Sequence, residues 1–336
     1  MIRCRPYTRL CPPPRVQPPH PAPPKAESTA PFILPGRRAQ EAPLAVITCH
    51  FNWAGYERPR QHLHRFLRQM QAQGLPVYGV EAVLPGQPAQ TAEMPGWCQV
   101  AADPQRHLLF QKEALLNLAE KLVPNQVCKI AWIDADVWLS PVDWAAQTAL
   151  LLDHFPIVQP YATAYWSGRE GPIQRVCPSA GSQRKLLTAG THPGFAMAAR
   201  RELWRDYGGL YPWMILGSGD MAFAAAALGL DIIKQNVGLG TSMILQADAD
   251  LYDPWYQKLL TWTRGRMAWT PGDCIHEWHG ERKDRDYVHR HELLPGQRAS
   301  QHLRVGQNGL IEWTDEAPPQ FITAARDYFV NRREDG

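Results

Sequence analysis

The sequence lacks paired cysteines and long apolar runs. Its seven cysteines are scattered and odd in number, and no two of them form a CxxC pair. This disfavours a disulfide framework or a thiolate zinc site and favours a reduced, cytoplasmic protein. No apolar run approaches the roughly 20 residues that a membrane span needs, and the basic N-terminus lacks the apolar core of a signal peptide. No internal repeat is visible, which leaves an ordinary globular domain.

Charge and length set weaker bounds. The net charge is +3 with a pI near 8.5, which suits phosphate-bearing ligands but is too weak by itself to indicate nucleic-acid binding. A chain of 336 residues is long enough for one large α/β domain or two small ones.

Composition divides the chain into three parts. Residues 1–42 are rich in proline, which prevents a helix or a central strand, so we expect a disordered or polyproline-II arm. Residues 43–295 carry the apolar periodicity of a folded domain. We expect residues 296–336 to be a C-terminal extension that packs on this domain.

Apolar periodicity predicts an alternating order of strands and helices in the central part. A strand, a loop, a helix and a second strand follow one another from residue 43 to residue 83, which is typical of a parallel, nucleotide-binding sheet. The predicted strands are 43–50, 77–83, 129–133, 155–160 and 194–199. The predicted helices are 60–73, 107–122 and 218–228. Residues 165–190 are expected to form a long surface loop, and the chain from 250 onward has only weak periodicity.

The strongest chemical signal follows the buried strand 129–133. Asp134 and Asp136 come directly after it, and ligands of open α/β sheets bind at the carboxyl ends of strands. Two carboxylates there can hold Mg²⁺ or Mn²⁺ together with a nucleotide diphosphate, because hard cations take carboxylate oxygens. A solvated turn at the end of a strand is the alternative.

A second signal combines histidines with cations. His276 and His279 are three residues apart, and imidazole is a good ligand for Mn²⁺ or Zn²⁺. Cationic donors suited to phosphate follow at Arg282, Lys283, Arg285 and Arg290. A metal ligand beside such cations is what a diphosphate leaving group requires, although a charged, solvated helix start is also possible.

A third signal is a carboxylate after a flexible turn. Asp220 follows Gly217-Ser-Gly219 and opens an apolar helix. It is either a simple N-cap or a carboxylate presented to an acceptor hydroxyl as a general base or hydrogen-bond acceptor.

Taken in order, the three signals resemble the GT-A glycosyltransferase superfamily, in particular its galactosyltransferase-like and polypeptide N-acetylgalactosaminyltransferase-like members. The resemblance covers residues 44–295. It implies an α/β fold with a mixed, mostly parallel sheet flanked by helices, in a single nucleotide-sugar-binding domain. It also implies a metal-dependent enzyme that moves a sugar from a nucleotide-sugar, a UDP-sugar first of all, to an acceptor hydroxyl.

The resemblance also implies roles for individual residues. Asp136 and His279 would bind Mn²⁺ or Mg²⁺, with Asp134 contacting the same metal, its bound water or the ribose. Asp220 would face the acceptor as the catalytic carboxylate. The residues that would grip the nucleotide-sugar are Thr48, His50, Asn52, Lys112, Asn117, Asp134 and Arg285. One departure concerns the turn before Asp220, which lacks the acidic Gly-Glu-Asp pattern and so offers a single carboxylate.

Other functions and several acceptors stay open at this stage. A catalytically silent sugar- or nucleotide-binding protein would share the fold. A metal-dependent phosphoester hydrolase is less favoured, because the sequence has no HExxH motif and no third clustered histidine. The acceptor could be a polysaccharide or other glycan, a protein, a small molecule or a hydroxymethylated DNA base of a virus. The lack of a membrane span favours a bacterial enzyme or one in the cytosol of a virus-infected host.

Overall fold

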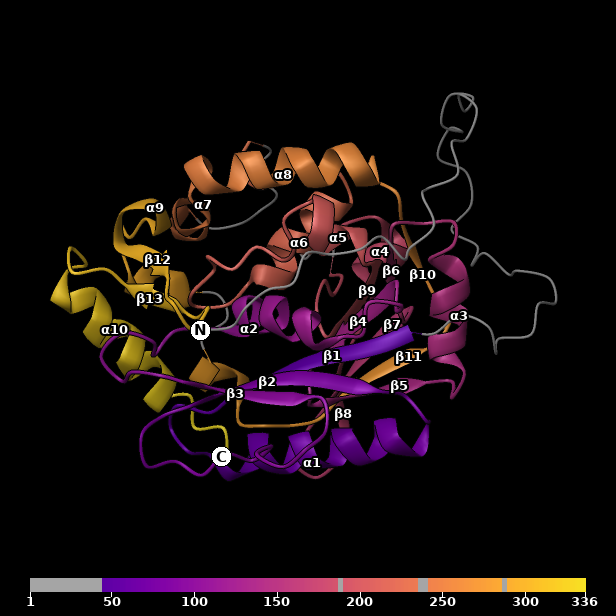
Figure 1. Cartoon of the computed structure of the whole chain (residues 1–336), viewed down its shortest axis with the longest axis horizontal. Coiled ribbons are helices and arrows are strands. Elements are labelled where there is room, and N and C mark those ends of the chain that lie inside the picture. Colours follow the sequence, from indigo (N-terminus) through magenta and orange to yellow (C-terminus); the bar gives the residue numbers. More distant parts are fainter. Residues whose placement is uncertain (1–43, 187–189, 235–240, 286–288) are drawn as a thin grey trace.

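The computed structural model describes residues 44–186, 190–234, 241–285 and 289–336. The predicted arm, residues 1–42, lies outside the described residues. Two sheets form the centre of the molecule, and helices cover both faces of the larger one (Figure 1). The described part is therefore an α/β fold, as predicted.

The larger sheet has seven strands in the order β10-β6-β9-β4-β1-β2-β3. β9 runs antiparallel to its neighbours β4 and β6, while the other neighbouring pairs are parallel. The predicted mixed, mostly parallel sheet is confirmed. In chain order its strands are β1 (Leu44–Phe51), β2 (Val77–Val83), β3 (Trp97–Ala101), β4 (Lys129–Ile133), β6 (Ile157–Gln159), β9 (Ala196–Arg200) and β10 (Met267–Trp269).

A second sheet of four strands adjoins the first, in the order β5-β11-β7-β8. Only residues 134–136 separate the end of β4 from the start of β5, so the two predicted aspartates lie at the junction of the sheets. The strands are β5 (Val137–Ser140), β7 (Thr163–Ser167), β8 (Ile173–Pro178) and β11 (Asp273–His276). A separate two-stranded ribbon contains β12 (Leu303–Val305) and β13 (Ile311–Trp313).

Alternation along β1 builds a core on each face of the large sheet. Ala45 and Ile47 belong to the larger core, which also contains most buried residues of α2, α6 and α8. Leu44 and Val46 belong to the smaller core, with α1 and α3. The helices are α1 (Glu57–Ala72), α2 (Lys112–Ala119), α3 (Trp144–Leu151), α4 (Ala180–Gln183), α5 (Glu202–Asp206), α6 (Gly219–Ala227), α7 (Thr241–Ala247), α8 (Ala249–Thr263), α9 (Ala299–His302) and α10 (Pro319–Val330).

The sequence predictions fail in three segments. The helix predicted at 107–122 begins only at Lys112, because the His107 ring accepts from the Asp103 backbone N–H and holds the preceding residues in a turn. The loop predicted at 165–190 contains the β7–β8 hairpin and α4. The weakly periodic stretch from 250 onward includes the 15-residue helix α8, whose aromatic rings pack on the larger core.

The C-terminal part shares the larger core. Leu303, Trp313, Phe321 and Phe329 are buried in the same cluster as Ile47 of the central strand. α10 and the residues after it also reach the start of α1, where Asp335 accepts hydrogen bonds from two backbone N–H groups. This segment consequently helps to enclose the site described below.

Two further expectations concern cysteines and membranes. Cys49, Cys98, Cys177 and Cys274, all within the described ranges, are free thiols; a fully reduced chain stays a prediction. Within the described ranges, no helix has the length and apolar character needed to cross a bilayer.

Candidate nucleotide and metal site

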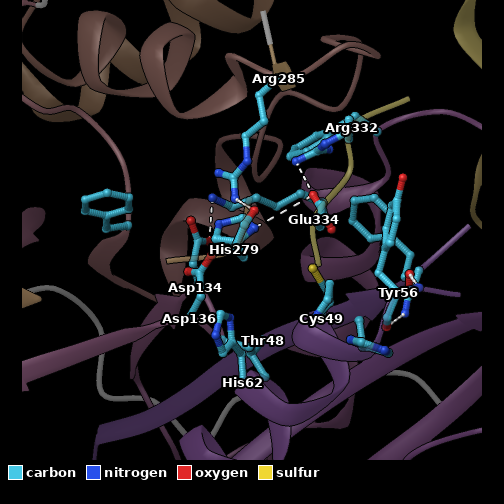
Figure 2. Close-up of a pocket in the computed structure, with 18 of the residues that line it drawn as sticks. Thr48, Cys49, Tyr56, His62, Asp134, Asp136, His279, Arg285, Arg332 and Glu334 are labelled. Carbon is cyan, nitrogen blue, oxygen red and sulfur yellow. Dashed lines mark hydrogen bonds and ion pairs between the residues drawn. The ribbon is translucent and has the colours of Figure 1, made fainter. Parts of the chain in front are cut away.

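A pocket opens where the carboxyl ends of β1 and β4 meet the second sheet. Figure 2 shows side chains from the central strands, α1 and the C-terminal segment converging on it. The residues given a role by the resemblance line this pocket, except for Asn117: Thr48, His50, Asn52, Lys112, Asp134, Asp136, Asp220, His279 and Arg285. His276 and Arg290 of the second signal line it too, whereas Arg282 and Lys283 are not among its lining residues.

Three side chains in the pocket converge as metal ligands would. One oxygen of Asp136, Oδ2, lies 2.8 Å from His279 Nε2 and 3.5 Å from His276 Nε2. The two Nε2 atoms are 3.1 Å apart. Metal–ligand bonds of about 2.1 Å put neighbouring ligands of an octahedral ion about 3 Å apart. Asp136, His276 and His279 form the one such cluster among the described residues.

The protonation states in this cluster suit a cation. Burial alone would raise the pKa of Asp136, but His276 and His279 hold it well below its usual range. Burial, together with the nearby charge of Arg285, lowers the pKa of His279 well below its usual range. Asp136 is therefore ionised and His279 neutral near pH 7, the forms that bind metals. Among the described residues, Asp136 Oδ1 is buried and has no hydrogen-bond partner, so the residues present fit a bound ion.

Asp134 was predicted as a metal ligand, but it is not part of this cluster. Its Oδ1 lies 2.5 Å from Lys112 Nζ, at the start of α2. Desolvation raises the pKa of Asp134 to about 6 against the opposing effect of Lys112. His276, which the sequence pairs with His279, is the third member of the cluster, and the metal contact of Asp134 stays a prediction.

A second carboxylate lies beside Asp220, and the sequence analysis missed it. Glu113 follows Lys112 on α2 and lines the pocket. Burial raises its pKa to about 7, Lys112 lowers it and Asp220 raises it further. Glu113 and Asp220 each lie against a glycine, Gly219 and Gly194 respectively. A Cβ at Gly219 would lie 2.2 Å from Glu113 Oε1. The only signal in the sequence was the charge of Glu113 beside Lys112.

Four cationic side chains line the pocket: Lys112, Arg285, Arg290 and Arg332. Arg285, which was predicted, donates from Nη2 to the backbone oxygen of His279 at 2.5 Å. Arg290 donates to Ser218 Oγ at 2.7 Å, just before α6. Arg332 comes from the C-terminal segment, which the sequence analysis did not connect with the site. Together with Lys112, these residues line a pocket that suits an anionic ligand.

The residues at the end of β1 serve first as supports. Thr48 Oγ1 donates to the Ile133 backbone oxygen at 2.8 Å and ties β1 to β4. Asn52 holds the turn at Tyr56 through two hydrogen bonds. Burial lowers the pKa of His50 to about 4, so its ring is neutral near pH 7. All three line the pocket wall. The side chains of Thr48 and Asn52 are held by these hydrogen bonds, and that of His50 is buried.

Asn117 lies outside the pocket lining, although the resemblance suggested a nucleotide contact. Its Oδ1 accepts from Trp204 Nε1 and from the Leu210 backbone N–H, both at 2.9 Å. Its amide nitrogen donates to the Leu210 oxygen at 2.8 Å. The side chain is thus occupied in holding the segment that follows α5.

A stack of rings supports the metal ligands. Phe195 lies between His192 and His276, with ring centroids 3.8 Å and 4.6 Å away. Phe195 has φ of 71°, a left-handed conformation that is rare for a bulky residue. Its backbone oxygen accepts from the Asp134 N–H at 2.8 Å. Strained backbone of this kind is found at functional sites, and here Phe195 connects Asp134, at the end of β4, with the ring of His276.

Gly194→Ala tests whether the position of Asp220 matters. A Cβ at Gly194 would lie 1.9 Å from Asp220 Oδ2, so the carboxylate must move, whereas the backbone φ of Gly194 is open to alanine. If Asp220 faces an acceptor, as the resemblance implies, turnover should fall roughly tenfold, because small misplacements of reacting groups are costly. Metal affinity should stay at the wild-type value. Wild-type turnover in this variant would show that the carboxylate needs no fixed place.

His291→Gln tests the linkage between burial and pH. Burial and the charge of Arg290 lower the pKa of His291 from 6.5 to about 3, so below pH 6.5 the unfolded chain takes up a proton that the folded chain excludes. The wild type should therefore lose about 1.4 kcal/mol of unfolding free energy per pH unit through this one group as the pH falls from 6 to 4. The variant should lack this component in urea titrations at each pH. Equal slopes for the two proteins would contradict a neutral buried His291.

Comparison with known proteins adds likeness of fold only. No family model matches the chain, and no curated protein matches it in sequence. Similar solved structures include a mutant of Drosophila β-1,4-galactosyltransferase 7 in complex with manganese, UDP-Gal and xylobiose, at 15% identity and a TM-score of 0.30 over 56% of this chain and 62% of that one. A Desulfovibrio desulfuricans protein described as a nucleotide-diphospho-sugar transferase is 10% identical, with a TM-score of 0.29, over 87% and 98% of the two chains.

A third similar structure is a glycosyltransferase involved in glycosylation of the major capsid of PBCV-1. It is 11% identical, with a TM-score of 0.24, over 72% of this chain and 98% of that one. The similar structures thus include transferases that act on nucleotide sugars. At these identities and TM-scores they carry no argument about activity, which has to come from the site.

Proposed function

We propose that the chain is a Mn²⁺-dependent glycosyltransferase that moves a sugar from a nucleotide-sugar, in the first place a UDP-sugar, to an acceptor hydroxyl. The observation that supports this most is the composition of one pocket. It combines the Asp136–His276–His279 cluster, four cations and the carboxylate Asp220 at the carboxyl ends of β1 and β4. A diphosphate leaving group needs such cations, and a hydroxyl nucleophile needs such an acid.

In this proposal the donor's diphosphate lies over the metal cluster and the cations. Asp136, His276 and His279 would hold the metal, which when bound neutralises charge on the departing diphosphate. Lys112 is held by Asp134 at the same wall, and Arg285 approaches from the loop of His279. The nucleoside would extend toward the end of β1, where Thr48, His50 and Asn52 line the pocket.

Asp220 would act on the acceptor. The acceptor oxygen forms a bond to the anomeric carbon, and the bond from that carbon to the diphosphate breaks with its electron pair on the leaving group. The acceptor proton passes to the Asp220 carboxylate, or is held by it during the attack. Glu113 lies close enough to Asp220 for the two charges to interact. We propose a glycan or a small hydroxylated molecule as acceptor.

The donor atoms favour Mn²⁺ over Mg²⁺. Two imidazoles and one carboxylate suit Mn²⁺, whereas Mg²⁺ prefers an all-oxygen shell that includes several waters. Transfer from a UDP-sugar should therefore be lost in EDTA and restored more fully by Mn²⁺ than by Mg²⁺. Full activity in metal-free buffer would remove the metal from the proposal.

Two other functions give different results in the same assay. A silent nucleotide-sugar-binding protein would bind the donor without releasing nucleotide. A phosphoester hydrolase would release phosphate from model esters without a sugar acceptor. The transferase is favoured over the hydrolase because Asp220 and Glu113 supply a carboxylate pair beside the cations, where an acceptor hydroxyl can be activated.

A further inference from the structure

The last described residues of the chain form one wall of the pocket. Arg332 and Glu334 line it together with the metal ligand His279. In Figure 2 both side chains point toward the pocket, and dashed lines join Glu334 to Arg332 and to His279. The resemblance described above ended at residue 295, so it gave these residues no role.

The segment 331–336 is fixed at the start of α1. Asp335 accepts from the backbone N–H groups of Glu57 and Arg58 at 3.0 and 2.8 Å, where the unpaired N–H groups of a helix favour a carboxylate. The Arg333 N–H donates to the Tyr56 hydroxyl at 2.9 Å. The position of Glu334, between these two anchors, is thus determined by the fold.

The same segment packs against the loop that carries His279. Gly280 has φ of 91°, and a Cβ there would lie 2.5 Å from the Arg333 backbone oxygen. On the other side of His279, the Trp278 ring contacts Gly336 and lies under the Arg58 guanidinium, 4.4 Å from the ring centre. The loop and the C-terminal segment therefore meet backbone to backbone, and glycine is required for that approach.

Glu334 faces the ring nitrogen of His279 that the metal cluster does not use. His279 Nε2 points at Asp136, while its Nδ1 lies 3.8 Å from Glu334 Oε1. Arg332 Nη2 holds the same Glu334 oxygen at 2.7 Å, and only 13% of each of these two side chains is exposed. A carboxylate behind a histidine ligand fixes the tautomer with the proton on Nδ1 and leaves Nε2 free to bind a metal.

We infer that Glu334 is a positioning residue for the metal site: it holds His279 in the orientation and tautomer that ligate the ion. The inference rests on the proposed metal site and extends it to the C-terminal segment. Arg332 holds the Glu334 carboxylate in place through their ion pair. Loss of Glu334 should weaken metal binding without removing a ligand.

Calorimetric titration of the full chain with Mn²⁺ alone, without donor, tests this. We expect Glu334→Ala to raise the Kd for Mn²⁺ about 10- to 100-fold, the usual effect of removing a carboxylate behind a metal-bound histidine. Glu334→Gln keeps an acceptor oxygen and should restore part of the affinity. Glu316→Ala, at an exposed carboxylate of the same C-terminal part, serves as the matched control and should bind as the wild type does.

The visible absorption of the Co²⁺-substituted protein gives a second readout, because the geometry of the histidine ligands determines it. A shifted spectrum in Glu334→Ala, with a melting temperature close to that of the wild type, would support the inference. Equal Mn²⁺ affinity and equal Co²⁺ spectra for wild type and Glu334→Ala would overturn it and leave the proposed function intact. A wild-type chain that binds no Mn²⁺ would overturn the proposed function, and the inference with it.

Discussion

Asp136→Ala should reduce sugar transfer by roughly 10³-fold or more while the protein stays folded. Asp136 Oδ2 is the atom shared by both histidine contacts, so its loss removes the centre of the metal cluster. A metal that neutralises a leaving group contributes several kcal/mol to the transition state, and each 1.36 kcal/mol is about tenfold in rate. The measurement is turnover with a UDP-sugar and Mn²⁺, together with the melting temperature.

The fold should tolerate this change because Asp136 is partly exposed and its structural contact is made by the backbone. Its carbonyl oxygen accepts from the Glu277 N–H at 2.8 Å, which alanine preserves. Asp206→Asn, at an exposed position at the end of α5, is a suitable control and should keep wild-type turnover. If Asp136→Ala also turned over at the wild-type rate, the two aspartates after β4 would be a structural turn.

Asp220→Asn should lower turnover by roughly 10²-fold or more, the usual scale for loss of a general base. The affinity for UDP should survive, because β1, Lys112 and the metal cluster provide the donor contacts in the proposal. The N-cap interpretation has less support, since Ser218 occupies the capping position and, within the described ranges, Asp220 accepts only from the adjacent Met221 N–H. Melting temperature, UDP affinity and turnover need to be measured on the same variant.

Glu113→Gln separates the roles of the two neighbouring acids. If Asp220 alone takes the acceptor proton, the effect of Glu113→Gln on turnover should be clearly smaller than that of Asp220→Asn. A loss of turnover in Glu113→Gln with an unaffected Asp220→Asn would move the catalytic role to Glu113. Unchanged turnover in both variants would leave the pocket without its proposed base.

The central sheet could be predicted because short segments of the sequence are enough to indicate its strands. A short apolar run such as 130–133 is typical of a buried strand, and the alternation of loops and helices between such runs favours parallel pairing. The hairpin at 165–190 and α8 were missed for the opposite reason. Their sequences look irregular, since Gly and Arg interrupt the hairpin and aromatic side chains of α8 point into the core.

The residues of the site differ in the same way: some belong to short sequence motifs, and others reach the site only through the fold. Asp136 and His279 belong to short motifs, and the structure brings them together with His276 across the junction of the two sheets. Glu113 and Glu334 belong to no motif: Glu113 acquires its raised pKa from burial beside Asp220, and Glu334 reaches His279 only because Asp335 is anchored at α1. Asn117 is the opposite case. Its place on a predicted helix suggested a contact with the nucleotide, but its side chain is already hydrogen-bonded to Trp204 and Leu210.

Metal-dependent transfer can be measured as nucleotide release from UDP-, GDP- and TDP-sugars in the presence of Mn²⁺ and a panel of glycan acceptors, repeated with EDTA. We expect release to be fastest with UDP-sugars, to depend on an acceptor and to be lost when EDTA removes the metal. Tight UDP-sugar binding without any release, or release that EDTA leaves unchanged, would contradict a metal-dependent glycosyltransferase.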